Sequence, residues 1–91
     1  MNNIEKALYD HLLTNASIAP DGILPVSKQL KDIGVSSLKF VLMMLELELV
    51  LGIKAFNKNN IIDVRTVGDV LALLEKSAGI PVAISLEHNV K

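Results

Sequence analysis

Residues able to act as acids, bases or nucleophiles are few and scattered in this chain of 91 residues. His11 falls on the apolar side of a predicted first helix and His88 lies near the end of the chain, so neither has a nucleophile or a carboxylate cluster beside it. Glu46 and Glu48 point in different directions on a predicted helix, and we expect both to be solvated surface charges. No phosphate-binding glycine loop and no metal-ligand spacing occurs. The chain is therefore predicted to have no active site of its own.

Ser37 is the residue whose position suggests chemistry. Gly34 can relax the backbone before a new helix, and Ser36 is a suitable N-cap, so that Ser37 would open an apolar helix. The free amides and partial positive charge of a helix N-terminus tolerate an anionic group such as a phosphodiester. A pair of serines that only caps the helix is the alternative. A serine hydrolase is disfavoured, because no histidine and carboxylate relay can be argued for either serine.

Composition narrows the class of protein. Apolar residues make up 51% of the chain and aromatic residues 3%, which favours helices packed through aliphatic side chains. The absence of cysteine excludes disulfides and thiolate chemistry. A net charge of −1 without a basic run makes nucleic acid an unlikely partner. The sequence contains no apolar stretch of about 20 residues and no export signal, which predicts a cytoplasmic protein without a membrane span.

Apolar residues at helical spacing predict helices over residues 3–13, 37–51 and 67–76. Gly52 is expected to end the second helix, while Thr66 and Asp69 form a capping box for the last. One brief helical turn fits near residues 61–64. The long connection over 15–36 should be held down by its own apolar residues. These anchors are Ile18, Ile23, Leu24, Val26, Leu30 and Ile33.

The stretch Asp32-Ile33-Gly34-Val35-Ser36-Ser37-Leu38, together with the order of helices that follows it, resembles the acyl and peptidyl carrier protein family. The resemblance runs from about Leu30 to Lys76. It implies an all-α fold: a four-helix bundle of the acyl carrier protein type, with three main helices, a short third helix and a long first loop. Residues 1–76 would form the carrier domain and residues 77–91 a C-terminal tail.

The resemblance also implies a cofactor and partners. Ser37 matches the serine that carries 4'-phosphopantetheine, which a phosphopantetheinyl transferase transfers from coenzyme A. An acyl or aminoacyl ligase or transferase would then load the arm with a thioester for downstream biosynthetic enzymes. The family usually has Asp where this chain has Ser36. Serine there is similar to some specialised stand-alone carriers, including those loaded with amino acids.

Carrier proteins usually meet their partners through an acidic face of the second helix, but here the corresponding residues are apolar. The resemblance places Phe40, Met43, Met44, Leu47 and Leu51 inside the bundle. The partner-binding residues expected from it are Leu38, Val41, Leu42, Leu45 and Ile62. Two alternatives stay open: the helix is buried on both sides, or the chain is an unmodified helical protein–protein interaction module.

The tail begins with the breaker Gly79-Ile80-Pro81 and then alternates apolar and small residues, which resembles a short extended segment. A frayed end, a docked tail and strand exchange with another chain are all compatible with this pattern.

Overall fold

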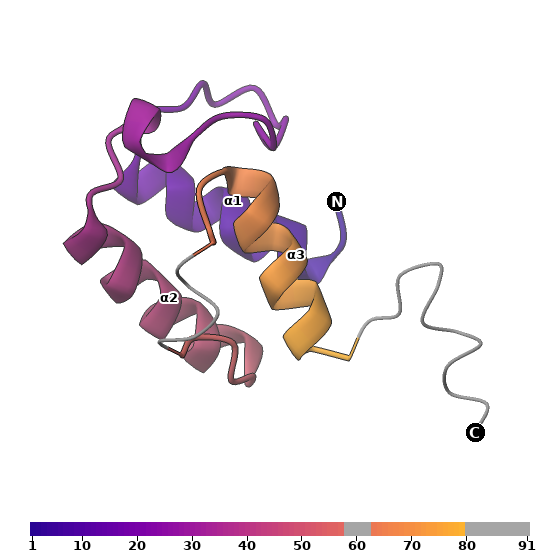
Figure 1. The fold of residues 1–91 in the computed structure, drawn as a ribbon. Coiled ribbons are helices and arrows are strands. Elements are labelled where there is room, and N and C mark those ends of the chain that lie inside the picture. The colour runs from indigo at the N-terminus through magenta and orange to yellow at the C-terminus, as the bar shows by residue number, and fades with distance from the viewer. Residues whose placement is uncertain (58–62, 80–91) are drawn as a thin grey trace.

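Three α-helices and one 3-10 turn make up the fold in the computed structural model, which describes residues 1–57 and 63–79. In chain order these are α1 (Asn3–Asn15), η1 (Leu30–Ile33), α2 (Ser37–Leu51) and α3 (Val67–Ser77). α1 packs against both α2 and α3, and the connection between α1 and α2 runs across one end of the three helices (Figure 1). The described residues contain no β-strand, so the predicted all-α class is confirmed for this part of the chain.

Local sequence accounts for where the helices begin and end. Ser36 is the N-cap of α2, and its hydroxyl accepts a hydrogen bond from the Lys39 amide over 3.2 Å. Gly52 ends α2 in the left-handed conformation (φ 68°), which glycine adopts without a steric penalty. Thr66 and Asp69 form the expected capping box at α3. α1 and α3 extend slightly beyond the predicted ends, by an amount typical of fraying helix termini.

The core lies where the three helices meet, and it is built almost wholly from aliphatic side chains and methionine. Its largest fully buried members come from all three helices, so no pair of helices buries the core alone. These are Leu8, Leu12, Met43, Met44, Leu47, Val67, Val70 and Leu74. Phe40 of α2 and Phe56 beyond it pack at the margin with ring centroids 6.3 Å apart.

The long first connection is held down by some of its predicted anchors and not by others. Leu30 and Ile33 are buried in η1, and Ile18 and Leu24 pack against the core. The prediction was wrong for Ile23 and Val26, which are 68% and 47% exposed.

The stretch around Ile23 is held by polar contacts and not by burial of the Ile23 and Val26 side chains. The Tyr9 hydroxyl accepts a hydrogen bond from the Gly22 amide at 2.7 Å.

Backbone hydrogen bonds join this connection to the start of α3. Leu30 N donates to Arg65 O at 2.8 Å, Val67 N donates to Lys28 O at 3.0 Å, and Gly68 N donates to Val26 O at 2.8 Å. Gln29 and Thr66 form an isolated antiparallel bridge between them. Two segments far apart in the sequence are thereby fixed side by side, next to the N-terminus of α2.

Two predictions lie outside the described residues. Half of the brief helical turn near 61–64, including Ile62, falls in 58–62, and most of the tail falls in 80–91. The part of the tail that the structure describes is Ser77, which ends α3, followed by a turn with Gly79 at φ 76°.

Candidate functional site

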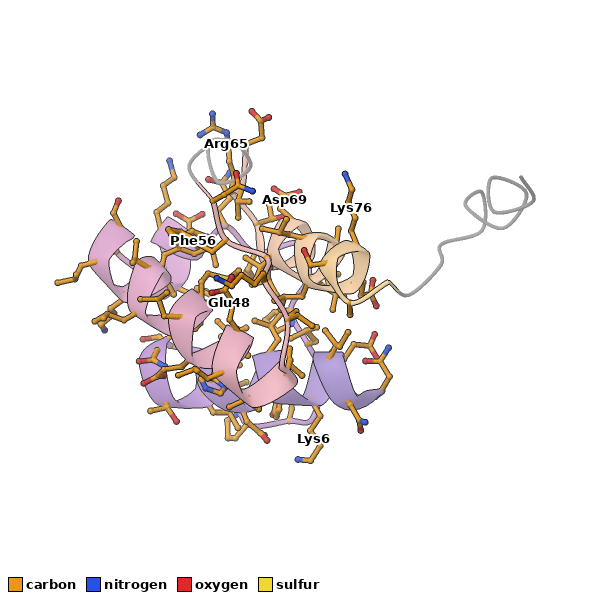
Figure 2. All side chains as sticks on the ribbon, turned by 90° about the horizontal axis from the view of Figure 1, so that it is seen from below. Lys6, Glu48, Phe56, Arg65, Asp69 and Lys76 are labelled. Carbon is orange, nitrogen blue, oxygen red and sulfur yellow. The ribbon has the colours of Figure 1, made fainter. Side chains whose placement is uncertain are left out.

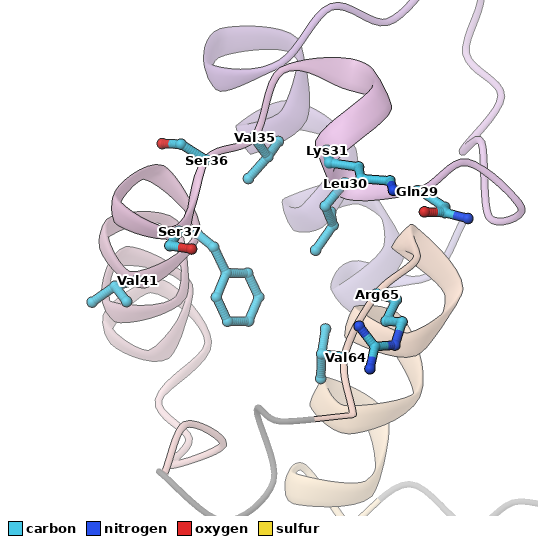
Figure 3. A pocket seen from close by; sticks show the side chains of 10 residues that line it. Gln29, Leu30, Lys31, Val35, Ser36, Ser37, Val41, Val64 and Arg65 are labelled. Atoms are coloured by element: carbon cyan, nitrogen blue, oxygen red, sulfur yellow. The ribbon is translucent and has the colours of Figure 1, made fainter.

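Ser37 is the first residue of α2 and is exposed to solvent. Gly34, with φ 83°, turns the chain from η1 toward α2, and the buried side chain of Val35 fixes the short segment that follows. In Figure 3 the Ser37 hydroxyl points toward a groove, whereas that of Ser36 points away from it. The serine expected to carry chemistry is thus accessible and held on a rigid element.

The groove beside Ser37 has a volume of about 380 Å³ and lies between α2 on one side and η1 and the start of α3 on the other (Figure 3). Its apolar lining comes from both sides of the groove and is made of Leu30, Val35, Phe40, Val41 and Val64. Gln29, Lys31 and Arg65 also line it, together with the two serines. A group attached to Ser37 therefore meets an apolar surface with two cationic side chains beside it.

The sequence did not predict that Arg65 and residues 29–31 line this groove, because they come from distant segments. Arg65 and Val64 reach it through the backbone pairing of residues 26–30 with 65–68. No local pattern in the sequence predicts that pairing, since an isolated bridge leaves no strand periodicity. The fold therefore places Lys31 and Arg65 on the wall of the groove that lies across from Ser37.

The N-terminus of α2 differs from those of the other two helices. α1 and α3 begin with capping boxes in which an acid at the third helical position, Glu5 or Asp69, accepts hydrogen bonds from backbone amides. In α2 the third position is Lys39, and the first turn has no acid. The partial positive charge of this helix end is therefore not offset by a carboxylate in its own first turn, and a lysine adds to it.

The residues expected to meet partners are placed as follows. Leu38, Leu42 and Leu45 are 69%, 52% and 45% exposed on the outer side of α2. Val41 is half-buried and lines the groove instead of standing fully outward. Ile62 lies outside the described residues.

Sequence reasoning missed two exposed apolar residues farther along α2. Leu49 is 84% exposed and Val50 is 64% exposed. Leu49 lies four residues after Leu45 and continues the helical spacing of Leu38, Leu42 and Leu45. This spacing is the sequence signal from which its exposure could have been predicted. Met43, Met44 and Leu47 are buried as expected, while Phe40 and Leu51 are half-buried. These outward leucines are exposed, so the first loop does not bury this side of α2, while the tail over 80–91 lies outside the described residues.

Glu48 corrects the prediction that both acids of α2 are solvated surface charges. Its Oε2 accepts hydrogen bonds from the backbone amides of Ala55 and Phe56, each at 2.7 Å (Figure 2). Hydrogen bonds to a carboxylate are stronger than those to neutral acceptors. Glu48 therefore holds the segment that follows α2 and is a structural residue, whereas Glu46 is exposed as expected.

His11 contacts its own helix and an acid of α2. Its Nδ1 lies 2.9 Å from the carbonyl oxygen of Ala7, and its Nε2 lies 3.7 Å from Oε1 of Glu46. Within residues 1–57 and 63–79, no group of acids and histidines is arranged to hold a metal ion. In the same residues no helix is long and apolar enough to cross a bilayer.

The carboxylate at the start of α3 is electrostatically tuned. Hydrogen bonds from the backbone amides of Arg65 and Thr66, both at 3.0 Å, lower the pKa of Asp69 below its ordinary value of 3.8. The Thr66 hydroxyl and the positive charge of Arg65 act in the same direction. Asp69 is exposed, so this effect belongs to the cap and not to a buried site.

Comparison of the chain with known protein families, with curated proteins and with solved structures finds no match.

Proposed function

We propose that this protein is a carrier that holds 4'-phosphopantetheine on Ser37 and presents an acyl or aminoacyl thioester to partner enzymes. The observation that carries the proposal is the exposed Ser37 hydroxyl at the first position of α2, facing a groove with an apolar lining and cationic side chains. The sequence around it, from Asp32 to Leu38, resembles the modification site of carrier proteins.

The residues around Ser37 fit such a group. A phosphodiester there would lie at a helix N-terminus whose first turn has Lys39 and no acid. Lys31 and Arg65 line the adjoining groove, and their positive charges also favour a negatively charged group. The apolar lining suits the uncharged part of a pantetheine arm or its cargo, because burying apolar surface there removes it from water.

The modification is a phosphoryl-group transfer in which this chain is the acceptor. The Ser37 hydroxyl oxygen forms a bond to the phosphorus that bears pantetheine in coenzyme A. The anhydride bond of coenzyme A breaks, 3',5'-ADP leaves, and the hydroxyl proton passes to a base of the transferase. The arm supplies a thiol, which a chain without cysteine otherwise lacks. This chain contributes position and recognition, while its partners supply the acid, base and nucleophile chemistry.

The proposal includes a fold subtype, partners and a compartment. The three described helices and η1 would belong to a four-helix bundle of the acyl carrier protein type, with residues 1–76 as the carrier domain. A phosphopantetheinyl transferase, an acyl or aminoacyl ligase or transferase, and downstream biosynthetic enzymes would be the partners, in the cytoplasm. The outward Leu38 and Leu42 next to Ser37 favour apolar contacts with them.

Intact-protein mass spectrometry tests the proposal. The chain is incubated with coenzyme A and a broad-specificity phosphopantetheinyl transferase, beside Ser37→Ala and the matched variant Ser36→Ala. We expect one phosphopantetheine on the natural chain and on Ser36→Ala, and none on Ser37→Ala. No mass gain, including with a transferase from the native host, or a gain that persists in Ser37→Ala, would contradict the assignment.

An unmodified interaction module is the second candidate function. The exposed leucines of α2 favour it, since an apolar helix face is a common docking surface. This function requires no covalent change at Ser37. The test is to purify the chain from its host and to measure both its mass and its binding to a partner. A fully unmodified chain that binds the partner through α2 would support the interaction module over the carrier.

A further inference from the structure

Four leucines form a continuous stripe along the outer face of α2, which we call the leucine stripe: Leu38, Leu42, Leu45 and Leu49. Their exposed fractions are 69%, 52%, 45% and 84%. The intervals of four, three and four residues are those of the apolar positions in a coiled coil. With about 100° between successive residues of a helix, the stripe points opposite to the side that faces the core.

A stripe of this kind on a rigid helix is suited to pairing with another helix. Single exposed leucines are common on protein surfaces, but a contiguous row marks an interaction site. The stripe extends for about 16 Å along α2, at 1.5 Å per residue. α2 is already folded and packed, so no ordering of the helix opposes association.

Charges beside the stripe favour a second copy of this chain in antiparallel orientation. Lys39 and Glu46 lie on the same edge of the stripe, seven residues apart. In an antiparallel pair, Leu38 of one copy meets Leu49 of the other, and Leu42 meets Leu45. The Lys39 side chain of each copy then lies next to Glu46 of the other, so the twofold axis forms this ion pair twice.

A parallel pair lacks this complementarity. In that orientation Glu46 of one copy lies across from Val41 of the other, and Lys39 has no acid opposite it. Both charged side chains are at the surface and each also contacts α1. The exposed Lys39 donates a hydrogen bond to Asn15 O at 3.4 Å, and Glu46, whose side chain is 62% exposed, lies 3.7 Å from His11. The charge pattern therefore selects one orientation.

The tail of the chain is a poorer match for the stripe. Val82, Ile84 and Leu86 recur at every second residue, which is the period of a strand, whereas the leucine stripe follows the period of a helix. The backbone amides of α2 are hydrogen-bonded within the helix, so it has no edge to which a strand can pair.

We propose that two copies of this chain associate through the leucine stripes of α2 in antiparallel orientation, with Lys39 and Glu46 paired across the interface. On a helical projection Ser37 falls on the opposite edge, with Val41, so pairing leaves its hydroxyl uncovered but covers Leu38, Leu42 and Leu45. Self-association and the docking of any enzyme on the stripe then exclude each other. The inference does not depend on modification of Ser37.

Sedimentation equilibrium over about 10 µM to about 1 mM protein tests the association, because an interface this short is expected to be weak. We expect a monomer–dimer equilibrium that Leu42→Asp abolishes. The matched control is Leu13→Asp, which changes a leucine that is 40% exposed on α1, outside the stripe. Circular dichroism checks that each variant keeps its helices. A chain that stays monomeric at every concentration, or a dimer that survives Leu42→Asp, would overturn the proposal.

Charge reversal tests the pairing. Lys39→Glu or Glu46→Lys alone should raise the dissociation constant about tenfold, because attraction becomes repulsion at two symmetric contacts. The double variant Lys39→Glu with Glu46→Lys should return it to within about threefold of the natural value. If the double variant is no better than the singles, the proposed pairing is wrong.

Disulfide cross-linking tests the orientation, and it is simple in a chain without cysteine. A mixture of Leu38→Cys and Leu49→Cys should give a mixed disulfide dimer under mild oxidation, because the antiparallel pair brings these positions together. Either variant alone should cross-link at least about tenfold less, since equivalent positions then lie about 16 Å apart along the axis. Preferential cross-linking of Leu38→Cys with itself would show a parallel pair and overturn the proposal.

Discussion

The starts of α2 and α3 lie on opposite sides of the groove beside Ser37 and are built in opposite ways. α3 begins with a closed capping box, in which Asp69 accepts hydrogen bonds from the amides of Arg65 and Thr66. Its second residue, Gly68, packs against Val26 of the connection between α1 and α2. α2 begins with one hydroxyl cap, a lysine at the third position and an exposed second residue, Leu38. The start of α3 helps to hold the fold together, whereas the start of α2 is exposed to solvent.

The second position of each helix should show the largest contrast. A Cβ at Gly68 would lie 3.0 Å from the carbonyl oxygen of Val26, a backbone atom that cannot move aside cheaply. Gly68→Ala should lower the free energy of unfolding by about 1–3 kcal/mol. Leu38→Ala, at the matching position of α2, should change it by less than about 0.5 kcal/mol. Urea unfolding measures both, and equal effects would break the comparison.

The third position should show a smaller contrast. Asp69→Ala removes the acceptor for two amides and the favourable charge at the helix end, which should cost about 1 kcal/mol. Lys39→Ala removes a cation from the same kind of position, and we expect no loss of stability beyond its weak contact with Asn15 O at 3.4 Å. Thermal unfolding of the two variants checks this, and a larger loss for Lys39→Ala would contradict it.

Installing an acid at the start of α2 should make it resemble α3. Lys39→Glu places a carboxylate three residues after the Ser36 cap, which completes a capping box and should raise the free energy of unfolding by about 0.3–1 kcal/mol. Urea unfolding at low protein concentration keeps self-association from contributing. Under the carrier proposal the same variant should accept phosphopantetheine more slowly. If Lys39→Glu lowers the free energy of unfolding, the start of α2 does not lack a stabilising acid as we describe.

Acid should weaken the start of α3 selectively. Because the folded state lowers the pKa of Asp69, it binds fewer protons there than the unfolded state does. The resulting stability is complete above the ordinary value of 3.8 and is lost as the pH falls through the lower folded value. Asp69→Asn should therefore reduce the slope of stability against pH below about pH 4 by a small amount, because Asp69 is exposed. Urea titrations at several acidic pH values measure it, and an unchanged slope would contradict the assignment.

The sequence predicts the features that depend on neighbours within a few residues. Ser36 as a cap, Gly52 as a terminator and the Thr66–Asp69 box follow from side chains near each helix end, and the structure confirms all three. The exposed stripe of α2 was predicted in part, from spacing and from the resemblance to carrier proteins. Leu49 follows the same spacing but lies at the far end of α2 from Ser37, outside the set of residues that the resemblance assigns to partners.

Contacts between segments that are far apart in the sequence could not be predicted from local patterns. The position of Glu48 on α2 predicts a surface acid, but the chain folds back after the helix and the amides of Ala55 and Phe56 donate hydrogen bonds to its carboxylate. Ile23 was predicted to be a core anchor because it is apolar. In the structure the Tyr9 hydroxyl holds that part of the loop, and Ile23 is exposed to solvent. The groove beside Ser37 likewise needs Arg65 and Val64 brought across from the far side of the chain.

The backbone bonds between residues 26–30 and 65–68 have a consequence for how the molecule opens. Because Leu30, Val67 and Gly68 donate across the two connections, their amides are shielded only while both segments stay together. Hydrogen–deuterium exchange at these three amides should be slow and should share one opening free energy, close to that of the whole fold. A partner that displaces the first loop would therefore also disturb the first residues of α3.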